Sequence, residues 1–281
     1  MEKPSIVSAE NPFTKEGLNY HLRIASKDIA QTVILPGDPD RVQMISTEWD
    51  KAQQVGKNRE FITHTGKFHG QALSAISTGI GNPAMATVVE SLARLGAKNL
   101  LRIGTTGCIQ PGIELGDIII STGAVRLDGA SKAYVRPEYP AVAHPEVVMA
   151  MVWACEELKL HYHLGITAST DSWYLGQGRA GYNDYYPSFS REILADMQLA
   201  GVVNFEMETS ALLTISGIYG LRSGAIFAVV ANRLENTFEV KGVEKAITAV
   251  NLAAVRLSQM DKEREIAGVK LWYPGLRKGG E

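Results

Sequence analysis

NLLRIGTTGCIQPG, residues 99–112, joins a short apolar run to a Gly-Thr-Thr-Gly turn and decides the fold. The apolar residues on both sides of Arg102 predict a strand that is buried on both faces. A guanidinium group in such a strand needs an anionic partner. The turn that follows offers backbone N–H groups and the hydroxyls of Thr105 and Thr106, which together suit a small oxyanion. At this point the partner of Arg102 is either a core carboxylate or a bound anion.

The composition is that of an ordinary globular protein, with 45% hydrophobic and 21% charged residues in a chain of 281. The net charge of −2 provides no basic field for nucleic acid or for an anionic membrane. The two cysteines, Cys108 and Cys155, have no metal-binding spacing and favour a reducing compartment, so we expect a cytoplasmic protein. We expect neither export nor membrane insertion, because the first twenty residues lack an apolar core and no apolar run approaches about 20 residues.

Two other segments place a glycine turn between a predicted strand and a predicted helix. In the first, PGDPDR at residues 36–41, a helix N-terminus and Arg41 form an anion-binding arrangement, although Asp38 could equally cap an ordinary turn. The second, at residues 77–84, matches the dinucleotide pattern G-x-G-x-x-A. The acidic residue that this pattern needs about 20 positions later is missing, so we expect no nicotinamide or flavin cofactor.

Polar side chains suited to a planar ring and to a diol occur further along the chain. Trp173 is followed by a glycine-rich loop with Gln177 and Arg179, which suits the polar edge of a heterocycle, although an exposed polar loop also fits. Glu206 and Glu208 lie two residues apart and point to the same side of an extended segment. They could accept hydrogen bonds from a vicinal diol or form a charge pair at a helix start.

His161 and His163 stand at alternate positions before Gly165. Two histidines in this pattern would bind a metal only with a third ligand, and no candidate lies nearby in the sequence. We therefore interpret them as a surface strand edge and predict no metal site.

No repeat and no shift in composition divides the chain, which favours one α/β domain over residues 21–260. Residues 1–20 are polar and aperiodic and are interpreted as an N-terminal arm. The domain ends in a long amphipathic helix from about residue 243 to residue 260. Residues 261–281 are rich in Lys, Arg and Gly and are expected to form a partly mobile tail.

Seven motifs occur in the same order as in uridine phosphorylases, so the chain resembles that family from about residue 20 to residue 260. They are PGDPDR (36–41), NREF (58–61), STGIGNP (77–83), LRIGTTGCIQP (101–111), VRLDGAS (125–131), GQGR (176–179) and NFEMET (204–209). The resemblance implies a nucleoside phosphorylase of the first structural class, in which a mixed central β-sheet forms a distorted barrel flanked by helices. It implies phosphate-dependent cleavage of uridine in pyrimidine nucleoside salvage and catabolism, with no cofactor. It also implies dimers with shared active sites, assembled into a hexamer.

The resemblance implies three groups of site residues. Phosphate would be bound by Gly37, Arg41, Arg102 and Thr105, and by Arg59 of the partner subunit. Ribose would be bound by Thr106, Met207 and Glu208, and by His21 of the partner subunit. The base would be bound by Trp173, Gln177, Arg179, Val230 and Ala231. The predicted catalytic residues are Arg102, Gln177, Arg179 and Glu208. The resemblance also favours a phosphate contact for Arg102, as one of three arginines around the anion, over a salt bridge with a core carboxylate.

Departures from the family pattern concern the base and a possible ion. Purine-specific relatives usually place an acid where this chain has Ala231-Asn232-Arg233, whose amide favours a pyrimidine. Trp173 and Leu175 replace a usual phenylalanine and proline, which leaves open the preference among uridine, deoxyuridine and thymidine.

Some relatives bind a monovalent cation between subunits through residues that match Glu60, the carbonyl of Ile80 and a serine replaced here by Ala84. This ion is possible and is not predicted. The alternative functions are a purine nucleoside phosphorylase or nucleosidase of the same superfamily, and a catalytically silent nucleoside-binding protein.

Overall fold

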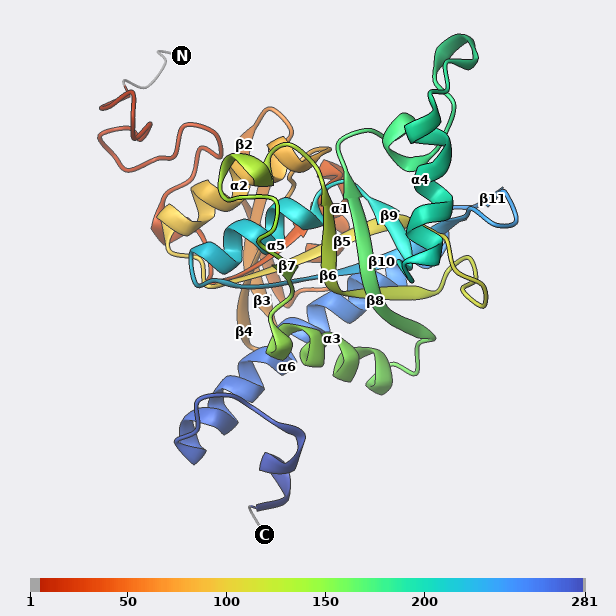
Figure 1. Cartoon of the computed structure of the whole chain (residues 1–281). Coiled ribbons are helices and arrows are strands. Elements are labelled where there is room, and N and C mark those ends of the chain that lie inside the picture. The colour runs from red at the N-terminus through yellow and green to blue at the C-terminus, as the bar shows by residue number, and fades with distance from the viewer. Residues whose placement is uncertain (1–5, 280–281) are drawn as a thin grey trace.

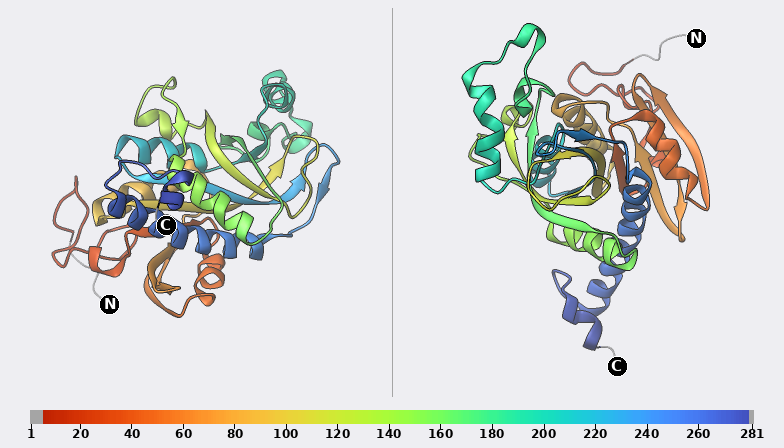
Figure 2. Two further views of the ribbon diagram at one scale, coloured as in Figure 1. Left: turned by 90° about the horizontal axis from the view of Figure 1, so that it is seen from below. Right: turned by 90° about the vertical axis from the view of Figure 1, so that its right-hand side faces the viewer.

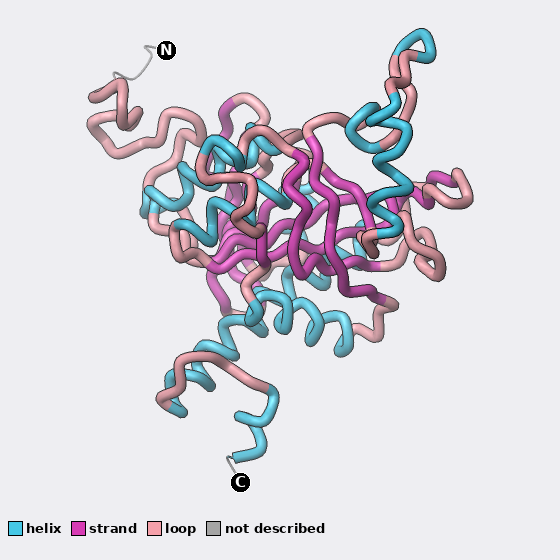
Figure 3. The backbone as a smooth tube through the Cα atoms, in the orientation of Figure 1, coloured by secondary structure: helices cyan, strands magenta, loops and turns pink. Residues whose placement is uncertain are grey.

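The computed structural model describes residues 6–279, whose strands and helices are traced in Figures 1 and 3. The strands are Thr32–Pro36 (β1), Lys51–Asn58 (β2), Phe61–Phe68 (β3), Gln71–Ile76 (β4), Asn99–Cys108 (β5), Ile118–Leu127 (β6), Ala141–Val142 (β7), Tyr162–Thr170 (β8), Asn204–Glu206 (β9), Arg222–Asn232 (β10) and Thr237–Phe238 (β11). The α-helices are Pro39–Thr47 (α1), Asn82–Leu95 (α2), Pro145–Glu157 (α3), Ser188–Leu199 (α4), Thr209–Ile218 (α5) and Val243–Ala267 (α6). Within the described range, no helix has both the length and the apolar character needed to cross a bilayer.

The central sheet closes on itself through β5. Its strand order is β11-β10-β6-β8-β9-β5-β1-β4-β3-β2, and β5 also pairs with β10. Five strands, β5, β10, β6, β8 and β9, therefore form a closed mixed barrel, which the right-hand view of Figure 2 shows end-on. The remaining long strands continue the sheet beyond the barrel. The predicted fold class, a single α/β domain whose mixed sheet forms a distorted barrel flanked by helices, is confirmed.

Strand β5 is where the barrel separates from the rest of the sheet. Along one edge it pairs with β10 over its whole length. Along the other edge, residues 99–103 pair with β1, whereas Gly107 and Cys108 pair with β9. Residues 104–106 thus lie where two neighbouring strands diverge. Such points in α/β sheets leave a crevice in which ligands bind.

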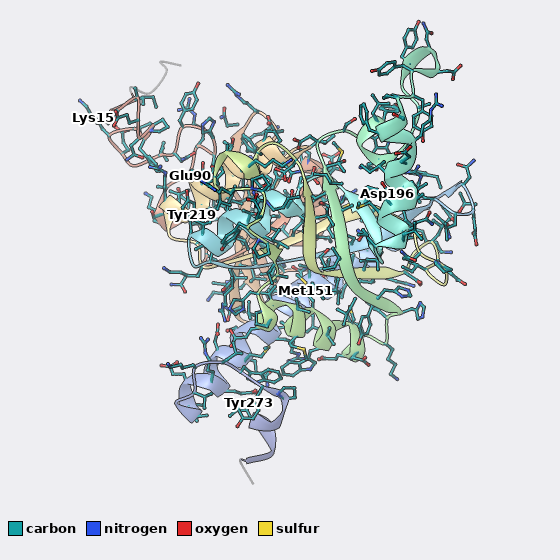
Figure 4. All side chains as sticks on the ribbon, viewed as in Figure 1. Lys15, Glu90, Met151, Asp196, Tyr219 and Tyr273 are labelled. Carbon is teal, nitrogen blue, oxygen red and sulfur yellow. The ribbon has the colours of Figure 1, made fainter. Side chains whose placement is uncertain are left out.

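Helices cover both faces of the sheet, and the alternation of side chains along β5 determines what each face receives. Leu100 packs in a core with α2 and α5, whereas Leu101 and Ile103 pack in a core with α1, α3 and α6. Because side chains alternate along a strand, Arg102 points to the same side as Leu100. Figure 4 labels Glu90 and Tyr219, whose hydrogen bond of 2.6 Å joins α2 to the end of α5.

The last helix is longer than predicted. It ends at Ala267 and not near residue 260, and Figure 1 shows its final turns extending from the body of the molecule. The apolar pattern ends at Met260 because the next five residues, 261–265, are all charged, so periodicity could not reveal the final turns. Trp272 then folds back and is buried, with its backbone N–H donating to Glu146 at 2.9 Å and its indole N–H to Glu263 at 2.7 Å.

Candidate active site

A cavity of about 660 Å³ opens at the divergence point of β5. Its wall combines segments that are far apart in sequence: the turns after β1 and β4, the middle of β5, the loop after β8, and β9 with the start of α5. Seven predicted site residues line it, namely Gly37, Arg41, Arg102, Thr105, Trp173, Met207 and Glu208.

The glycine turns that follow β1 and β4 contact each other, because β1 and β4 are parallel neighbours in the sheet. The backbone N–H of Gly79 donates to the carbonyl of Gly37 at 3.0 Å. A Cβ atom at Gly37 would stand only 3.2 Å from the Gly79 oxygen, so the close approach requires glycine. Asp38 caps α1 by accepting the N–H of Asp40 at 2.9 Å, so this turn is an ordinary capped turn that also borders the cavity.

Arg102 is 4% exposed and forms a buried salt bridge with two carboxylates. Its Nε donates to Glu206 at 3.2 Å, and its Nη2 donates to Glu208. The prediction that Arg102 is not in a core salt bridge is therefore wrong: closure of the barrel brings the carboxylates, about a hundred residues away in sequence, beside β5. Its Nη1 is buried and has no acceptor among residues 6–279. Such a donor is costly to leave unmatched and suits an anion.

Gly104 makes room for this guanidinium group. A Cβ atom at that position would lie 2.9 Å from the ring of Phe227 and 3.1 Å from Nη2 of Arg102. The Phe227 ring packs beneath the charge, with 5.6 Å between the guanidinium carbon and the ring centroid. The Gly-Thr-Thr-Gly turn predicted at residues 104–107 is wrong, because these residues continue β5 and pair with β10; Gly104 provides the space for packing around Arg102.

The two glutamates do different things. Glu206 accepts the N–H groups of Glu208 and Thr209, both at 2.9 Å, and so caps the N-terminus of α5. Glu208 accepts the N–H of Gly81 at 2.5 Å. Burial raises the pKa of Glu208; the charge of Arg102 opposes this shift and the carboxylate of Glu206 adds to it. The helix-start interpretation therefore holds for Glu206. Both glutamates line the cavity, but each oxygen of Glu208 accepts only one donor, from Gly81 or from Arg102, and so keeps a lone pair for a ligand.

Arg41 and Thr105 bring unpaired polar groups to the cavity. Neither the Arg41 guanidinium nor the Thr105 hydroxyl has a hydrogen-bond partner in the described part of the chain. Burial lowers the pKa of Arg41; Asp38 opposes this shift, and the positive charge of Arg102 lowers the pKa further. Two guanidinium groups that repel each other in a partly buried site favour the binding of an anion between them.

The loop after β8 carries a cluster of interacting side chains next to the cavity. Arg179 lies over the ring of Trp173, with its guanidinium carbon 4.3 Å from the centroid, and donates to the Gln177 side-chain oxygen at 2.6 Å. The side-chain nitrogen of Gln177 is buried and finds no acceptor within residues 6–279. Burial lowers the pKa of Arg179 to about 10, and the charge of Arg233 contributes. Gln177 and Arg179 do not line the cavity themselves, but Trp173 does.

Arg233 supports this loop, and sequence reasoning missed it. It donates to the carbonyl of Gln177 at 2.8 Å and to that of Gly178 at 3.2 Å. Its neighbour Asn232, whose amide was predicted to favour a pyrimidine, donates to the carbonyl of Ile113 at 3.3 Å and accepts the N–H of Leu234 at 3.0 Å. The amide is therefore part of a turn, and its role in base choice stays a prediction.

A second missed residue is Asn82, which connects the segments around the cavity. Its side-chain oxygen accepts the N–H of Ala211 at 3.0 Å and lies 3.0 Å from the hydroxyl oxygen of Ser210. Its side-chain nitrogen donates to Asp171 at 3.3 Å. The Ser210 hydroxyl donates in turn to Asp128 at 2.6 Å. The motifs STGIGNP and VRLDGAS contained Asn82 and Asp128, but only the fold reveals that they meet.

Three predicted residues lie in the sheet and do not line the cavity. Thr106 is buried, with its hydroxyl donating to the carbonyl of Phe205 at 2.7 Å and accepting from Asn204 at 2.7 Å. It thus positions β9, on the opposite side of β5 from Thr105. Val230 and Ala231 are buried in β10.

The two residues expected from a partner subunit lie together, away from the cavity wall. Arg59 is exposed at the β2–β3 turn. Burial lowers the pKa of His21, and the charge of Arg59 lowers it further. The side chain of Asn58 donates to the carbonyl of His21 at 2.6 Å and so attaches the arm to this turn. The motif NREF and the end of the arm therefore form one surface.

Comparisons with known proteins agree on the family. The model of the phosphorylase superfamily matches residues 31–263. The chain is 52% identical over 271 residues to a uridine phosphorylase of Thermococcus kodakarensis, covering 96% of this chain and 98% of that one. It is 40% identical over 246 residues to a uridine phosphorylase of Escherichia coli, covering 84% and 96%. A guanosine phosphorylase of Halorubrum lacusprofundi is 35% identical over 212 residues, covering 75% and 83%. The chain therefore belongs to the phosphorylase superfamily and, within it, to the uridine phosphorylase family.

Proposed function

We propose that this protein is a pentosyltransferase that cleaves uridine with phosphate to give uracil and ribose 1-phosphate. The observation that carries the proposal is the set of unmatched groups around one cavity. Arg41, Thr105 and Nη1 of Arg102 are free donors, Glu208 is a carboxylate, and the Gln177 nitrogen is a free donor near Trp173. The free donors around Arg102 match an anion, the carboxylate of Glu208 matches a diol, and the Gln177 nitrogen matches the carbonyl edge of a ring.

Phosphate is assigned to the side of the cavity with Arg41, Arg102 and Thr105, where the Gly37 turn also lies. Phosphorolysis forms an oxocarbenium-like ribosyl cation that phosphate attacks at C1′, so the protein supplies no nucleophile. The C1′–N1 bond breaks and a C1′–O bond to phosphate forms. The arginines hold phosphate on the face of the sugar opposite the base, where its negative charge also stabilises the cation.

Ribose is assigned to Glu208 and Met207, with the carboxylate accepting hydrogen bonds from the sugar hydroxyls. The base is assigned to the loop with Trp173, Gln177 and Arg179. The free amide N–H of Gln177 donates to a uracil carbonyl, and the charge of Arg179 stabilises the negative charge that develops on the departing base. No resident cofactor is needed, because phosphate is a co-substrate. Thr106, Val230 and Ala231 do not line the cavity; they contribute indirectly, by positioning the strands that form its wall.

Product analysis tests the proposal. Uridine, thymidine and inosine are incubated with the protein, each with and without phosphate, and the free base and ribose 1-phosphate are measured. We expect phosphate-dependent release of uracil. Release of uracil without phosphate would indicate a nucleosidase, faster cleavage of inosine would indicate a purine phosphorylase, and binding without turnover would indicate a silent nucleoside-binding protein.

Replacement of Gln177 by alanine is expected to raise KM for uridine at least about tenfold and to change KM for phosphate little, because the side chain serves only the base. Steady-state kinetics with each substrate varied in turn measures both values. Gln110→Ala is the matched control, since this amide donates to the carbonyls of Gln198 and Val202, both at 2.9 Å, away from the cavity. An equal effect of Gln177→Ala on both substrates would refute the base-edge role.

The proposed assembly is a homo-oligomer, a hexamer built from three dimers, in which Arg59 and His21 complete the partner's site. Arg59 is exposed and His21 partly buried, the two lie close together, and neither lines the cavity of its own chain, which supports this arrangement. The reducing environment expected from the free, buried Cys108 and Cys155 supports a cytoplasmic location. Glu60, Ile80 and Ala84 border the same cavity, which keeps a monovalent cation between subunits possible.

Sharing of sites can be measured by mixing two inactive variants. Arg59→Ala and Arg102→Ala chains are each expected to be nearly inactive. After unfolding and refolding at equal amounts, half of the dimers are hybrids with one intact site, so about a quarter of the wild-type activity should return. Each variant refolded alone is the control. Failure of the mixture to exceed the controls, with hybrids demonstrated by native mass spectrometry, would place Arg59 in the site of its own chain.

A further inference from the structure

Three metal-binding side chains meet at the end of β8 opposite to the loop that carries Trp173. His161 Nδ1 and His163 Nε2 each lie 2.9 Å from the same oxygen, Oδ2 of Asp117. The expectation that the histidines have no third ligand is wrong, because the parallel pairing of Ile118 with Tyr162 brings Asp117 beside them. The two imidazole rings lie edge to face, with their centroids 4.9 Å apart.

We propose that Asp117, His161 and His163 bind one divalent transition-metal ion of the zinc type. Two imidazole nitrogens and one carboxylate oxygen are a common ligand set for such ions, whereas Mg²⁺ and Ca²⁺ prefer oxygen ligands throughout. The proposal is independent of the proposed phosphorolysis, which uses none of these residues.

The distances allow a tetrahedral ion after the side chains rotate. All three ligand atoms lie within 4.8 Å of one another. In a tetrahedral site with bonds of about 2.0–2.1 Å, ligand atoms are about 3.3 Å apart. The two contacts of 2.9 Å therefore need to lengthen by a few tenths of an ångström, and the two imidazole nitrogens need to reach the same separation from each other. An ion would replace the hydrogen bonds that now join the histidines to the carboxylate.

The surroundings hold two of the ligands and leave the third accessible. Asp117 Oδ2 also accepts the N–H of Glu114 at 3.0 Å, which orients the carboxylate. The side chains of Asp117 and His163 are 11% and 23% exposed, whereas that of His161 is 70% exposed. An ion can thus enter from solvent at His161, and water can take the fourth position.

Calorimetry with Zn²⁺ on protein without an affinity tag tests the proposal, supported by electron paramagnetic resonance with Cu²⁺ as a probe. We expect one site per chain, two nitrogens bound to Cu²⁺, and no saturable binding of Mg²⁺ or Ca²⁺. His161→Gln and His163→Gln should each weaken Zn²⁺ binding by about ten- to a hundredfold. His69→Asn is the control, because His69 is exposed elsewhere and its φ of 47° is one that asparagine tolerates.

Thermal unfolding supplies a second readout. At one Zn²⁺ concentration, chosen near the wild-type Kd, Zn²⁺ should raise the Tm of the wild-type protein and of His69→Asn by mass action, and should raise that of His161→Gln much less. Because His161 is largely exposed, its replacement leaves the fold intact. The proposal is overturned by an absence of saturable Zn²⁺ binding, or by binding of equal strength in His161→Gln. In either case the three side chains form only a hydrogen-bonded group.

Discussion

Replacement of Arg102 by alanine is expected to lower kcat/KM for phosphate at least about a hundredfold, the size of effect that follows loss of one preorganised charged donor. The variant loses the only guanidinium nitrogen in this strand that lacks a protein acceptor, Nη1, and with it a contact proposed for phosphate. It also leaves Glu206 and Glu208 facing each other without a cation. Steady-state kinetics with phosphate varied, together with the Tm of the same preparation, separates the two effects.

The loss of the buried salt bridge has its own cost, about 3–5 kcal/mol of unfolding free energy. Arg102→Lys keeps a positive charge beside the two glutamates. Its compact ammonium group lacks the planar fork that spaces Nε, Nη1 and Nη2 toward three separate acceptors, so the variant should fold better and still lose phosphate affinity. Arg222→Ala is the matched control. Arg222 forms ion pairs with Glu146 at 2.9 Å and with Asp261 at 2.6 Å, at the far end of β10, so its loss should lower Tm and leave phosphate kinetics unchanged. Unchanged kinetics in Arg102→Ala would refute the phosphate assignment.

The double role of Arg102 explains how far sequence reasoning could go. The anomaly of a charge in an apolar strand correctly indicated a partner, and the two readings, carboxylate or anion, were both sound. The structure shows a carboxylate pair on two of the nitrogens and an open third one. The sequence around the strand does not reveal which nitrogens bind carboxylates and which one stays free, because this depends on how closure of the barrel brings β9 against β5.

The same limit applies elsewhere in the site. The strands and the glycine turns that follow β1 and β4 could be predicted from local sequence. Their position beside the cavity could be anticipated as well, because both turns follow strands of one sheet. Asn82, Arg233 and the Asp117–His161–His163 group could not, because each depends on the register between strands or on contacts between distant loops. Thr105 and Thr106 are adjacent threonines in one motif, and they point to opposite sides of β5. Only Thr105 lines the cavity, and the sequence alone does not show which of the two does so.

Replacement of Glu208 by glutamine is expected to lower kcat/KM for uridine by about a hundredfold or more. Oε1 of Glu208 accepts the N–H of Gly81 and Oε2 accepts Nη2 of Arg102, so each oxygen keeps one lone pair for a sugar hydroxyl. The amide has a single oxygen acceptor and presents an NH₂ donor to one of these partners. Glu206→Gln is the matched control. Both oxygens of Glu206 already accept backbone N–H groups at the start of α5, so that variant should lose stability and keep more of its uridine affinity. Equal losses of uridine affinity in the two variants would refute a specific role for Glu208.

The pH dependence of binding provides a sharper test of Glu208. Burial raises its pKa above the usual value of 4.5, so the carboxylate takes up a proton at a higher pH than an exposed glutamate does. The protonated form accepts hydrogen bonds poorly, and uridine affinity should therefore fall on acidification while the pH is still above 4.5. Measuring the Kd of uridine by calorimetry without phosphate avoids titration of the co-substrate. In Glu208→Gln the affinity is expected to be weak at every pH and to lack this acidic decline. A decline of the same size and midpoint in Glu208→Gln would assign the titration to another group and leave Glu208 without its proposed part in holding the ribose.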